Sequence, residues 1–330
     1  MSPAIYPWQQ AVWRHLLSYI ELQRIPQALL VTGLSGIGKR HLAVAYGRAL
    51  MCQAPLNDYA ACGSCQSCKL FEAQTHPDFL LVEPDEPGKA IGIDKIRQLI
   101  VKLALKPQFD RYRVVIISPA DGLNNASANA FLKCLEEPTA RTCLILLTEK
   151  PSRLPATIRS RCQVVACDAP ERDIAVHWLK QQGAGENSDV LLGLSQGAPL
   201  LAREYARQNF ITVRQDYFDA WLQVAEGKKN LLALAEQWQK PAALELNVLL
   251  TWMLGWVADL IKFAAQIESD QLRNSDLKKP LQALAKRLEL KRLYPFYDSL
   301  LIARSQLSTP INKQLLLEQI LISWSQLNNR

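Results

Sequence analysis

The spacing of apolar residues divides the chain into two parts. In the first part, short apolar runs alternate with segments whose apolar residues recur every three or four positions, which is the pattern of strands alternating with helices. Nearly unbroken apolar runs are typical of parallel strands covered on both faces. The pattern therefore predicts a three-layer α/β domain with helices on both faces of a parallel sheet. We expect strands at 27–32, 79–82, 112–117 and 142–148, a further apolar run at Val164 and Val165, and helices at 8–22, 41–51, 125–137 and from Asp94 onward.

The second part, from Pro170 onward, shows helical spacing only. Short amphipathic stretches continue to about residue 208, and longer ones follow at 213–224, 230–239, 243–267, 279–288, 293–307 and 312–326. Segment 243–267 is apolar on nearly all sides, so other helices must cover it on all sides. We therefore expect three domains: an α/β domain at 1–168, a small helical domain at 169–208 and an all-helical domain at 209–330.

Composition and charge exclude some classes of protein. The chain has 330 residues, 49% of them hydrophobic, which is typical of a folded protein rather than a disordered tail. A net charge of +7 allows contact with nucleic acid, yet the basic residues are scattered, with short clusters only at Lys228–Lys229 and Lys278–Lys279. The first residues lack a charged segment followed by an apolar one, and no apolar run approaches the ~18 residues that span a bilayer. The sequence thus predicts a soluble cytoplasmic protein with no membrane partner.

A glycine-rich loop lies between the first predicted strand and its helix. It reads Gly33-Leu34-Ser35-Gly36-Ile37-Gly38-Lys39-Arg40, the GxxxxGK spacing of a phosphate-binding loop. Glycines let backbone N–H groups turn inward, the helix N-terminus favours anions, and the lysine reaches the terminal phosphates. The candidate nucleotide-binding residues are Gly33, Gly36, Gly38 and Lys39.

Two features of a nucleotide-hydrolysing site are missing. Lys39 is followed by Arg40 instead of the serine or threonine whose hydroxyl ligates magnesium. The strand at 112–117 ends in Ser118-Pro119, where a hydrolase carries two acidic residues, and Asp121 fits a turn or cap. We therefore expect a degenerate loop that does not bind ATP and magnesium productively. The alternative is an ATP-hydrolysing subunit that uses Lys39 with an unusual metal ligand.

Four of the cysteines follow a metal-ligand spacing: Cys52, Cys62, Cys65 and Cys68. Two CxxC steps bring three thiolates onto one tight turn, which Gly63 supports, while the fourth arrives from the preceding helix. No histidine or carboxylate lies among them to leave an open coordination position, so the pattern predicts a structural zinc module at 52–68. A disulfide pair and an iron–sulfur cluster are the alternatives. The remaining cysteines lie in apolar contexts and fit small core residues: Cys134, Cys143, Cys162 and Cys167.

A Ser-Arg-Cys signature, Ser160-Arg161-Cys162, lies between the apolar runs at 144–147 and 164–165. An arginine at the end of a strand–loop unit, on a nucleotide-binding fold without its own catalytic carboxylates, is suited to serve the nucleotide of a neighbouring subunit. Such an arginine accelerates phosphoryl transfer by about 10³- to 10⁵-fold. The alternative is that Arg159 and Arg161 are solvated loop arginines.

Taken together, residues 27–162 resemble the AAA+ subunits of the bacterial DNA polymerase III clamp loader. The resemblance implies a RecA-like AAA+ domain, a small helical lid at 169–208 and an all-helical oligomerisation collar at 209–330. Besides the glycine-rich loop and the four-cysteine insert, it is carried by His76-Pro77-Asp78, Asn129-Ala130-Phe131-Leu132-Lys133, Leu135-Glu136-Glu137-Pro138 and Ile158-Arg159-Ser160-Arg161-Cys162.

The departures from the family pattern imply a particular subunit. ATP-hydrolysing members keep Lys-Ser/Thr, two acidic residues and an arginine in the small helical domain, whereas segment 194–200 has no arginine. The resemblance thus implies the subunit that does not hydrolyse ATP and whose arginine, here Arg161, completes the adjacent site. Its implied partners are the ATP-hydrolysing subunits, the clamp-opening delta subunit, the sliding clamp and primed DNA, at the replisome on the bacterial nucleoid. A zinc-dependent DNA-binding adaptor is a further alternative.

Overall fold

The structure is a computed structural model that describes residues 5–56, 58–86, 88–137, 139–240, 244–267, 272–307 and 309–328. Its contacts divide the chain into two compact units, Met1–Ala175 with Ala198–Leu201, and Val176–Gly197 with Ala202–Arg330. Two positions named above, Pro138 of the Leu135–Pro138 motif and Ala243 at the start of the long apolar segment, lie outside the described residues.

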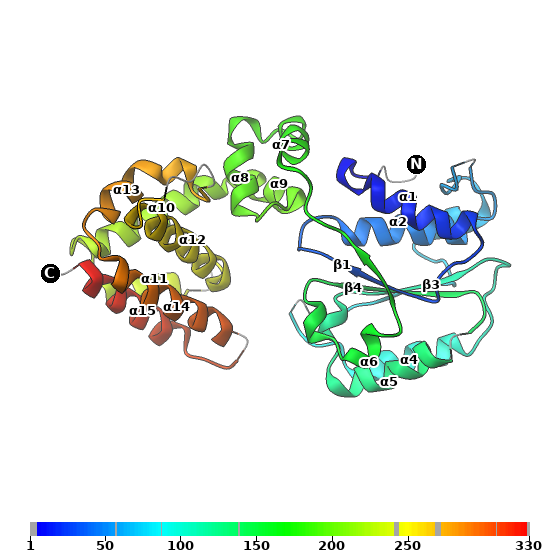
Figure 1. The fold of residues 1–330 in the computed structure, drawn as a ribbon. Helices are drawn as coiled ribbons and strands as arrows, with labels where there is room; N and C mark the ends of the chain where they lie inside the picture. Colours follow the sequence, from blue (N-terminus) through cyan, green and yellow to red (C-terminus); the bar gives the residue numbers. More distant parts are fainter. Residues whose placement is uncertain are drawn as a thin grey trace. The chain divides into compact units, whose positions relative to one another are not determined.

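The first unit is built on a parallel five-stranded sheet in the order β2-β3-β4-β1-β5 (Figure 1). Strand β1 lies inside the sheet between β4 and β5, with Leu30 opposite Leu146 on one side and Val164 on the other. The predicted strands are confirmed to within one residue at each end. Their bounds are β1 (Ala28–Thr32), β2 (Phe79–Val82), β3 (Arg113–Ile117), β4 (Thr142–Thr148) and β5 (Gln163–Ala166).

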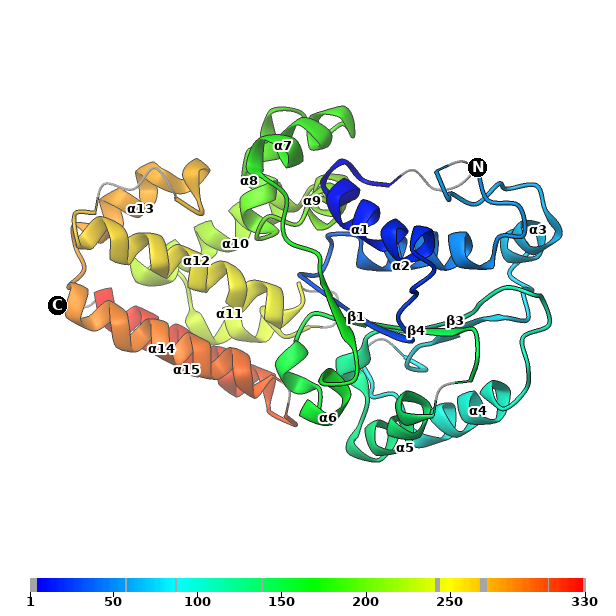
Figure 2. The same cartoon turned by 45° about the vertical axis from the view of Figure 1, so that its right-hand side comes forward.

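Helices cover both faces of this sheet, as Figures 1 and 2 show. On one face lie α1 (Gln10–Glu21) and α2 (Lys39–Met51), and on the other lie α4 (Ile93–Leu103), α5 (Asn125–Glu136) and the single-turn α6 (Ala156–Arg159). Since side chains alternate along a strand, Leu29 packs into the core beneath α1 and α2, whereas Leu30 packs into the core beneath α4 and α5. The predicted three-layer α/β architecture is confirmed.

The remaining described elements are helical. Short 3₁₀ turns are η1 (Pro7–Gln9), η2 (Ala120–Gly122), η3 (Pro151–Arg153), η4 (Gly185–Asn187) and η5 (Ser275–Leu277). The α-helices that follow the sheet are α7 (Arg172–Gln181), α8 (Ser188–Leu194), α9 (Pro199–Arg207), α10 (Phe210–Ala225), α11 (Leu231–Trp238), α12 (Leu246–Ala264), α13 (Lys278–Ala285), α14 (Leu290–Gln306) and α15 (Lys313–Asn328).

The core of the second unit is centred on α12 and on stacked tryptophans. The Trp221 and Trp324 rings lie 3.7 Å apart between centroids, and Trp324 Nε1 donates to Trp221 O at 3.0 Å. Trp256 of α12 packs against Trp221 at 5.2 Å. Burial of the polar indole N–H is stabilised by such a bond to a carbonyl, so α10, α12 and α15 share one core.

The expectation that no apolar stretch reaches the length of a membrane span was wrong. The helix α12 has 19 residues and a mean hydropathy of 1.4, so it reaches the length and composition of a membrane span. However, 61% of that stretch is buried inside the structure, and α13 and α14 pack against it. A helix buried to this extent is a core helix. This agrees with the expectation that other helices cover segment 243–267.

Candidate functional site

The four predicted metal ligands come together at one end of α2. Cys52 follows the last residue of α2, Cys62 lies in the turn, Cys65 caps α3 (Gln66–Glu72), and Cys68 lies in its first turn. Their sulfurs all lie within 4.8 Å of one another, and Cys52 Sγ is 3.8 Å from Cys68 Sγ and 4.0 Å from Cys65 Sγ. Sulfurs that share a tetrahedral zinc at ~2.3 Å are roughly 3.8 Å apart. The cluster therefore fits a single metal ion.

The same distances argue against the two alternatives for these cysteines. A disulfide joins its sulfurs at about 2.05 Å, and all the cysteines are free thiols. An iron–sulfur cluster inserts several atoms between its thiolates and would spread them farther than a single ion does. Gly63, at φ +74°, supplies a left-handed turn within the first CxxC step, between Cys62 and Cys65.

Hydrogen bonds prepare part of this cluster for a cation. Cys62 Sγ accepts bonds from the N–H groups of Ser64 (3.4 Å) and Cys65 (3.3 Å) and from the Ser64 hydroxyl (3.5 Å). These bonds, led by the Ser64 hydroxyl, lower the pKa of the Cys62 thiol to about 6. Burial raises the pKa of Cys68 to about 12. A bound metal ion would compensate for this burial, because it is the thiolate that coordinates the metal.

A buried histidine ties the cysteine module to the sheet. His76 is bonded through Nε2 to Ser67 Oγ of α3 (2.8 Å) and accepts the Asp78 N–H at Nδ1 (3.1 Å). Since Nδ1 accepts, the proton of the neutral ring lies on Nε2. Burial lowers the pKa of His76 below its ordinary value, against the nearby Asp78 carboxylate. Ser67 Oγ also donates to Met51 O at 2.8 Å, so the motif His76-Pro77-Asp78 joins α2, α3 and β2.

The glycine-rich loop has the backbone of a phosphate loop, but its lysine turns back onto it. Gly36 and Gly38 have φ of 74° and 90°. The Lys39 ammonium donates to Gly33 O (2.9 Å) and Leu34 O (2.7 Å). Burial lowers the pKa of Lys39, although Glu149, at 3.9 Å, favours its charged form. The amine that would reach terminal phosphates is therefore bonded to carbonyls of its own loop.

Other groups bond two further carbonyls of this loop. Trp8 Nε1 and Gln9 Nε2 both donate to Ile37 O, at 2.9 and 3.0 Å. On the opposite side, the Leu200 N–H donates to Gly36 O at 3.0 Å. Residues at the two ends of the first unit's sequence thus hold the loop in place.

The positions at which a nucleotide hydrolase would bind magnesium have other side chains or other partners. Arg40 forms an ion pair with Glu83, directly after β2, with Nη1 3.0 Å from Oε1. After β3 come Ser118 and Pro119, neither of which offers a carboxylate. Asp121 lies in η2 and accepts a hydrogen bond from the Thr148 hydroxyl at 2.6 Å. Its carboxylate is therefore already bonded at the end of β4.

A hollow of about 270 Å³ lies beside the loop. Among its described lining residues, the one carboxylate is Glu149, which faces Lys39. Leu200 lines its edge, in the segment where the resemblance implies an arginine for ATP-hydrolysing members. Among these described lining residues there is no second carboxylate, and the one arginine, Arg40, comes from the loop itself.

Arg161 lies at the surface, in the turn between α6 and β5. Its guanidinium donates to Thr157 O (3.0 Å) and to Glu136 Oε1 at the end of α5 (2.8 Å), and its side chain is 38% exposed. Ile158 and Cys162 on either side are buried in the core beneath α4 and α5, which fixes the turn. The sequence reasoning was wrong to describe a strand–loop unit, because the short helix α6 precedes Arg161.

The structure does not bring Arg161 to the phosphate loop. The turn of Arg161 packs with α5, whereas α2, which begins at Lys39, covers the opposite face of the sheet (Figure 1). Glu136 was noted in the sequence only as part of a motif. Its bond to Arg161 spans 25 positions, and no local pattern predicts such a contact.

Comparison with known proteins accounts for both parts of the chain. Residues 8–171 match the family described as "DNA polymerase III, delta subunit", and residues 208–326 match "DNA polymerase III, delta subunit, C terminal". Among solved structures, a DNA polymerase III gamma subunit-related protein of Thermotoga maritima is similar with a TM-score of 0.50 and 18% identity, over 96% of this chain and 99% of that one. This likeness supports the predicted fold class.

Full-length relatives narrow the assignment. DNA polymerase III subunit delta' of Pseudomonas aeruginosa is 35% identical over 98% of both chains. The protein of that name from Escherichia coli is 32% identical over 96% of this chain and 94% of its own. On this similarity along nearly the whole length, the chain belongs to the family of delta-prime subunits of DNA polymerase III.

Proposed function

We propose that the chain is the non-hydrolysing subunit of the DNA polymerase III clamp loader, which supplies Arg161 in trans to the ATP site of a neighbouring subunit. The observation that carries this proposal is the state of its own loop. Lys39 donates to Gly33 O and Leu34 O instead of pointing away from the loop. Arg40 pairs with Glu83 where magnesium would need a hydroxyl. A chain with this loop is suited to assist hydrolysis rather than to perform it.

The surroundings of Arg161 support its role. An arginine that serves a neighbour must be exposed and yet held in a defined direction. Arg161 meets both conditions, because Glu136 and Thr157 O orient a guanidinium that remains partly exposed. The planar fork can bond two oxygens of a transferring phosphoryl group, and a residue supplied by another subunit makes hydrolysis depend on correct assembly.

The helical part of the chain and the partners complete the proposal. We assign 169–208 to a lid and 209–330 to a collar that joins the chain to ATP-hydrolysing subunits and to the clamp-opening delta subunit. In that ring the chain would support ATP-dependent loading of the sliding clamp onto primed DNA in the bacterial cytoplasm, at the nucleoid. The exposed apolar side chains of α14 and α15 include Ile302 and Leu315, and they are suited to contacts between helical domains.

The cysteine module is assigned a structural zinc ion. Cys52, Cys62, Cys65 and Cys68 would hold it, and all four positions of a tetrahedral ion are then used by protein sulfur. Such a site supplies folding stability and no catalysis. The proposal includes no productive binding of ATP or magnesium by the loop at Gly33.

The test is DNA-stimulated ATP hydrolysis by the reconstituted loader. Three preparations differ in this chain alone: wild type, Arg161→Ala and Lys39→Ala. We expect a large loss with Arg161→Ala, because the site that receives this arginine slows by about 10³-fold or more, and near-normal hydrolysis with Lys39→Ala. Size-exclusion chromatography establishes that all three assemble equally.

The opposite pattern would support the alternatives. Loss of hydrolysis with Lys39→Ala but not with Arg161→Ala would mean that the chain runs its own nucleotide site. Salt-sensitive DNA binding by the free chain that disappears on zinc removal would favour a DNA-binding adaptor.

A further inference from the structure

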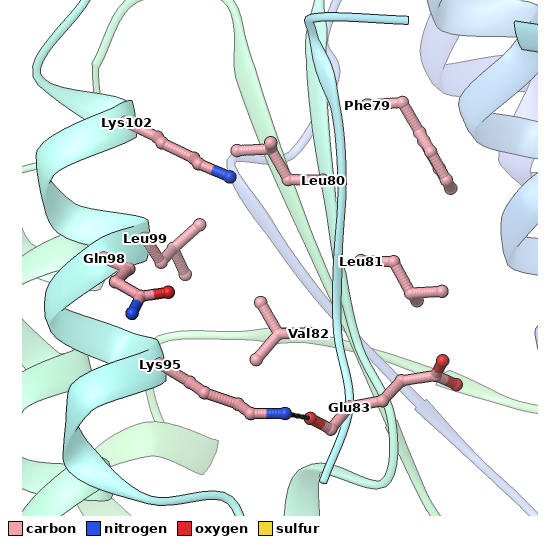
Figure 3. A pocket seen from close by; sticks show the side chains of 9 residues that line it. All are labelled: Phe79, Leu80, Leu81, Val82, Glu83, Lys95, Gln98, Leu99 and Lys102. Atoms are coloured by element: carbon pink, nitrogen blue, oxygen red, sulfur yellow. Dashed lines mark hydrogen bonds between the residues drawn. The ribbon is translucent and has the colours of Figure 1, made fainter. Parts of the chain in front are cut away.

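The free edge of β2 borders a second hollow, which shares no lining residue with the hollow beside Lys39. The sheet order puts β2 at one end, so β3 is its one described neighbouring strand. A hollow of about 310 Å³ lies between β2 and α4. Figure 3 shows Leu80 and Val82 pointing from the strand toward α4, from which Leu99 and Lys102 point back. The hollow thus has an apolar floor and an open strand beside it.

The backbone of β2 is available for pairing at this edge. The Val114 N–H donates to Asp78 O (2.9 Å) and the Ser118 N–H donates to Val82 O (3.0 Å). Because the peptide groups of successive residues in a strand point in opposite directions, the N–H and C=O of Leu81 point away from β3. The Leu81 side chain is 39% exposed. Such an edge is a template for a further strand.

Among the described residues that line this hollow, one cation has no ion-pair partner. Lys95 pairs with Asp85 (2.7 Å) and donates to Glu83 O (2.6 Å), while the Glu83 carboxylate pairs with Arg40. Lys102 forms no ion pair within the described part of the chain, and Figure 3 shows its amine extending over Leu80. Lysines also guard strand edges against aggregation. Lys95 protects the edge in this way because it donates to the Glu83 carbonyl, whereas Lys102 does not cover the peptide group of Leu81.

We propose that this edge binds an extended, acidic peptide segment of a partner protein. The segment adds as a strand beside β2, its backbone bonds the N–H and C=O of Leu81, and a carboxylate reaches Lys102. Alternate side chains of a strand lie on one face, so an apolar side chain two positions from that carboxylate enters the hollow over Leu80 and Val82. Backbone bonds give such complexes affinity, and side-chain pockets give them specificity.

The test uses the full chain and a phage-displayed library of random peptides about ten residues long, enough to overhang a short strand. Selections run in parallel on wild type, Leu81→Pro and Leu81→Ala. Proline removes the outward N–H and is tolerated at strand edges, whereas alanine keeps that N–H. An enriched peptide is then synthesised and titrated against Lys102→Gln and against Lys150→Gln, a change of another exposed lysine.

We expect acidic peptides that are enriched on wild type and Leu81→Ala but not on Leu81→Pro, and that slow hydrogen exchange of the Leu81 amide. Loss of one charge-assisted bond should weaken binding about tenfold in Lys102→Gln, with no change in Lys150→Gln. The proposal is overturned if no peptide is enriched over Leu81→Pro, or if the selected peptides bind Lys102→Gln as tightly as wild type. The lysine substitution lies on the surface and preserves the fold, so it decides the matter even if Leu81→Pro unfolds.

Discussion

Asp78 and Arg113 form a buried ion pair in which Oδ1 lies 3.1 Å from Nη2, with side chains 1% and 5% exposed. The guanidinium also donates to the backbone carbonyls of three residues at and after the end of α4, and Asp78 Oδ2 accepts two N–H groups from the loop that follows. The residues bonded in this way are Lys102, Leu105, Lys106, Gln108 and Phe109. The pair therefore fixes the segment between α4 and β3. Asp78 of the His76-Pro77-Asp78 motif thus has a structural role.

Removing one partner of this pair should destabilise the first unit strongly. Asp78→Ala leaves the Arg113 charge buried and unpaired, which costs about 3–5 kcal/mol. The measurement is native-state hydrogen exchange of the β3 amides, which reports unfolding of this unit. Asp94→Ala is the matched control, since it breaks the exposed Asp94–Arg97 pair and should cost no more than ~1 kcal/mol. Equal effects of the two substitutions would contradict the prediction.

The first unit should lose stability as the pH falls below 6.5, the ordinary pKa of histidine. His76 has a lowered pKa in the folded state, so the unfolded chain binds this proton first. The contribution of His76 to the free energy of unfolding is fully present above pH 6.5. It declines by up to ~1.4 kcal/mol per pH unit until the pKa of the folded state is reached. Comparison with His76→Asn isolates this contribution, because the amide can still accept the Asp78 N–H and both chains keep the four cysteines. Identical pH profiles would show that His76 does not titrate in this way.

The cysteine cluster should bind one metal ion per chain. Metal analysis of protein purified under reducing conditions should give about one zinc per chain, and Cys68→Ser should abolish it, because three thiolates leave the tetrahedron open. Chelation of the metal should unfold the turn at 52–68 first. Cys134→Ser is the control, since Cys134 is a buried core cysteine whose pKa burial raises to about 11. A chain that contains no zinc would rule out the assignment.

The sequence predicted well those features that depend on near neighbours. Strands β1 to β4 and the longer helices of both units follow from local periodicity, and the four ligands follow from their spacing. The helices α3 and α6 were missed because their seven and four residues are too few to show a helical period clearly. The length of the apolar stretch in α12 was underestimated because Asp259 and Lys262 interrupt the run, although both lie within the helix.

Contacts between residues that are distant in the sequence could not be predicted from local patterns. Arg40 led to the prediction of a degenerate loop, but the bonds of Lys39 to loop carbonyls and of Leu200 to Gly36 require the folded chain. In the same way, Glu136 is recognised as the partner of Arg161 only when α5 and α6 pack together. Local patterns therefore identified candidate residues, and tertiary packing decided how their side chains are directed.

The proposed role of Arg161 requires a planar fork and not merely a positive charge. Lysine carries the same charge as a single point donor and cannot bond two phosphoryl oxygens in parallel. In the reconstituted loader, Arg161→Lys should therefore lose nearly as much DNA-stimulated hydrolysis as Arg161→Ala, and pre-steady-state kinetics should place the loss in the chemical step. Arg159→Lys, two residues away on α6, is the matched control and should keep near-normal rates. Retention of most activity in Arg161→Lys would mean that this arginine contributes only to the general field at the subunit interface.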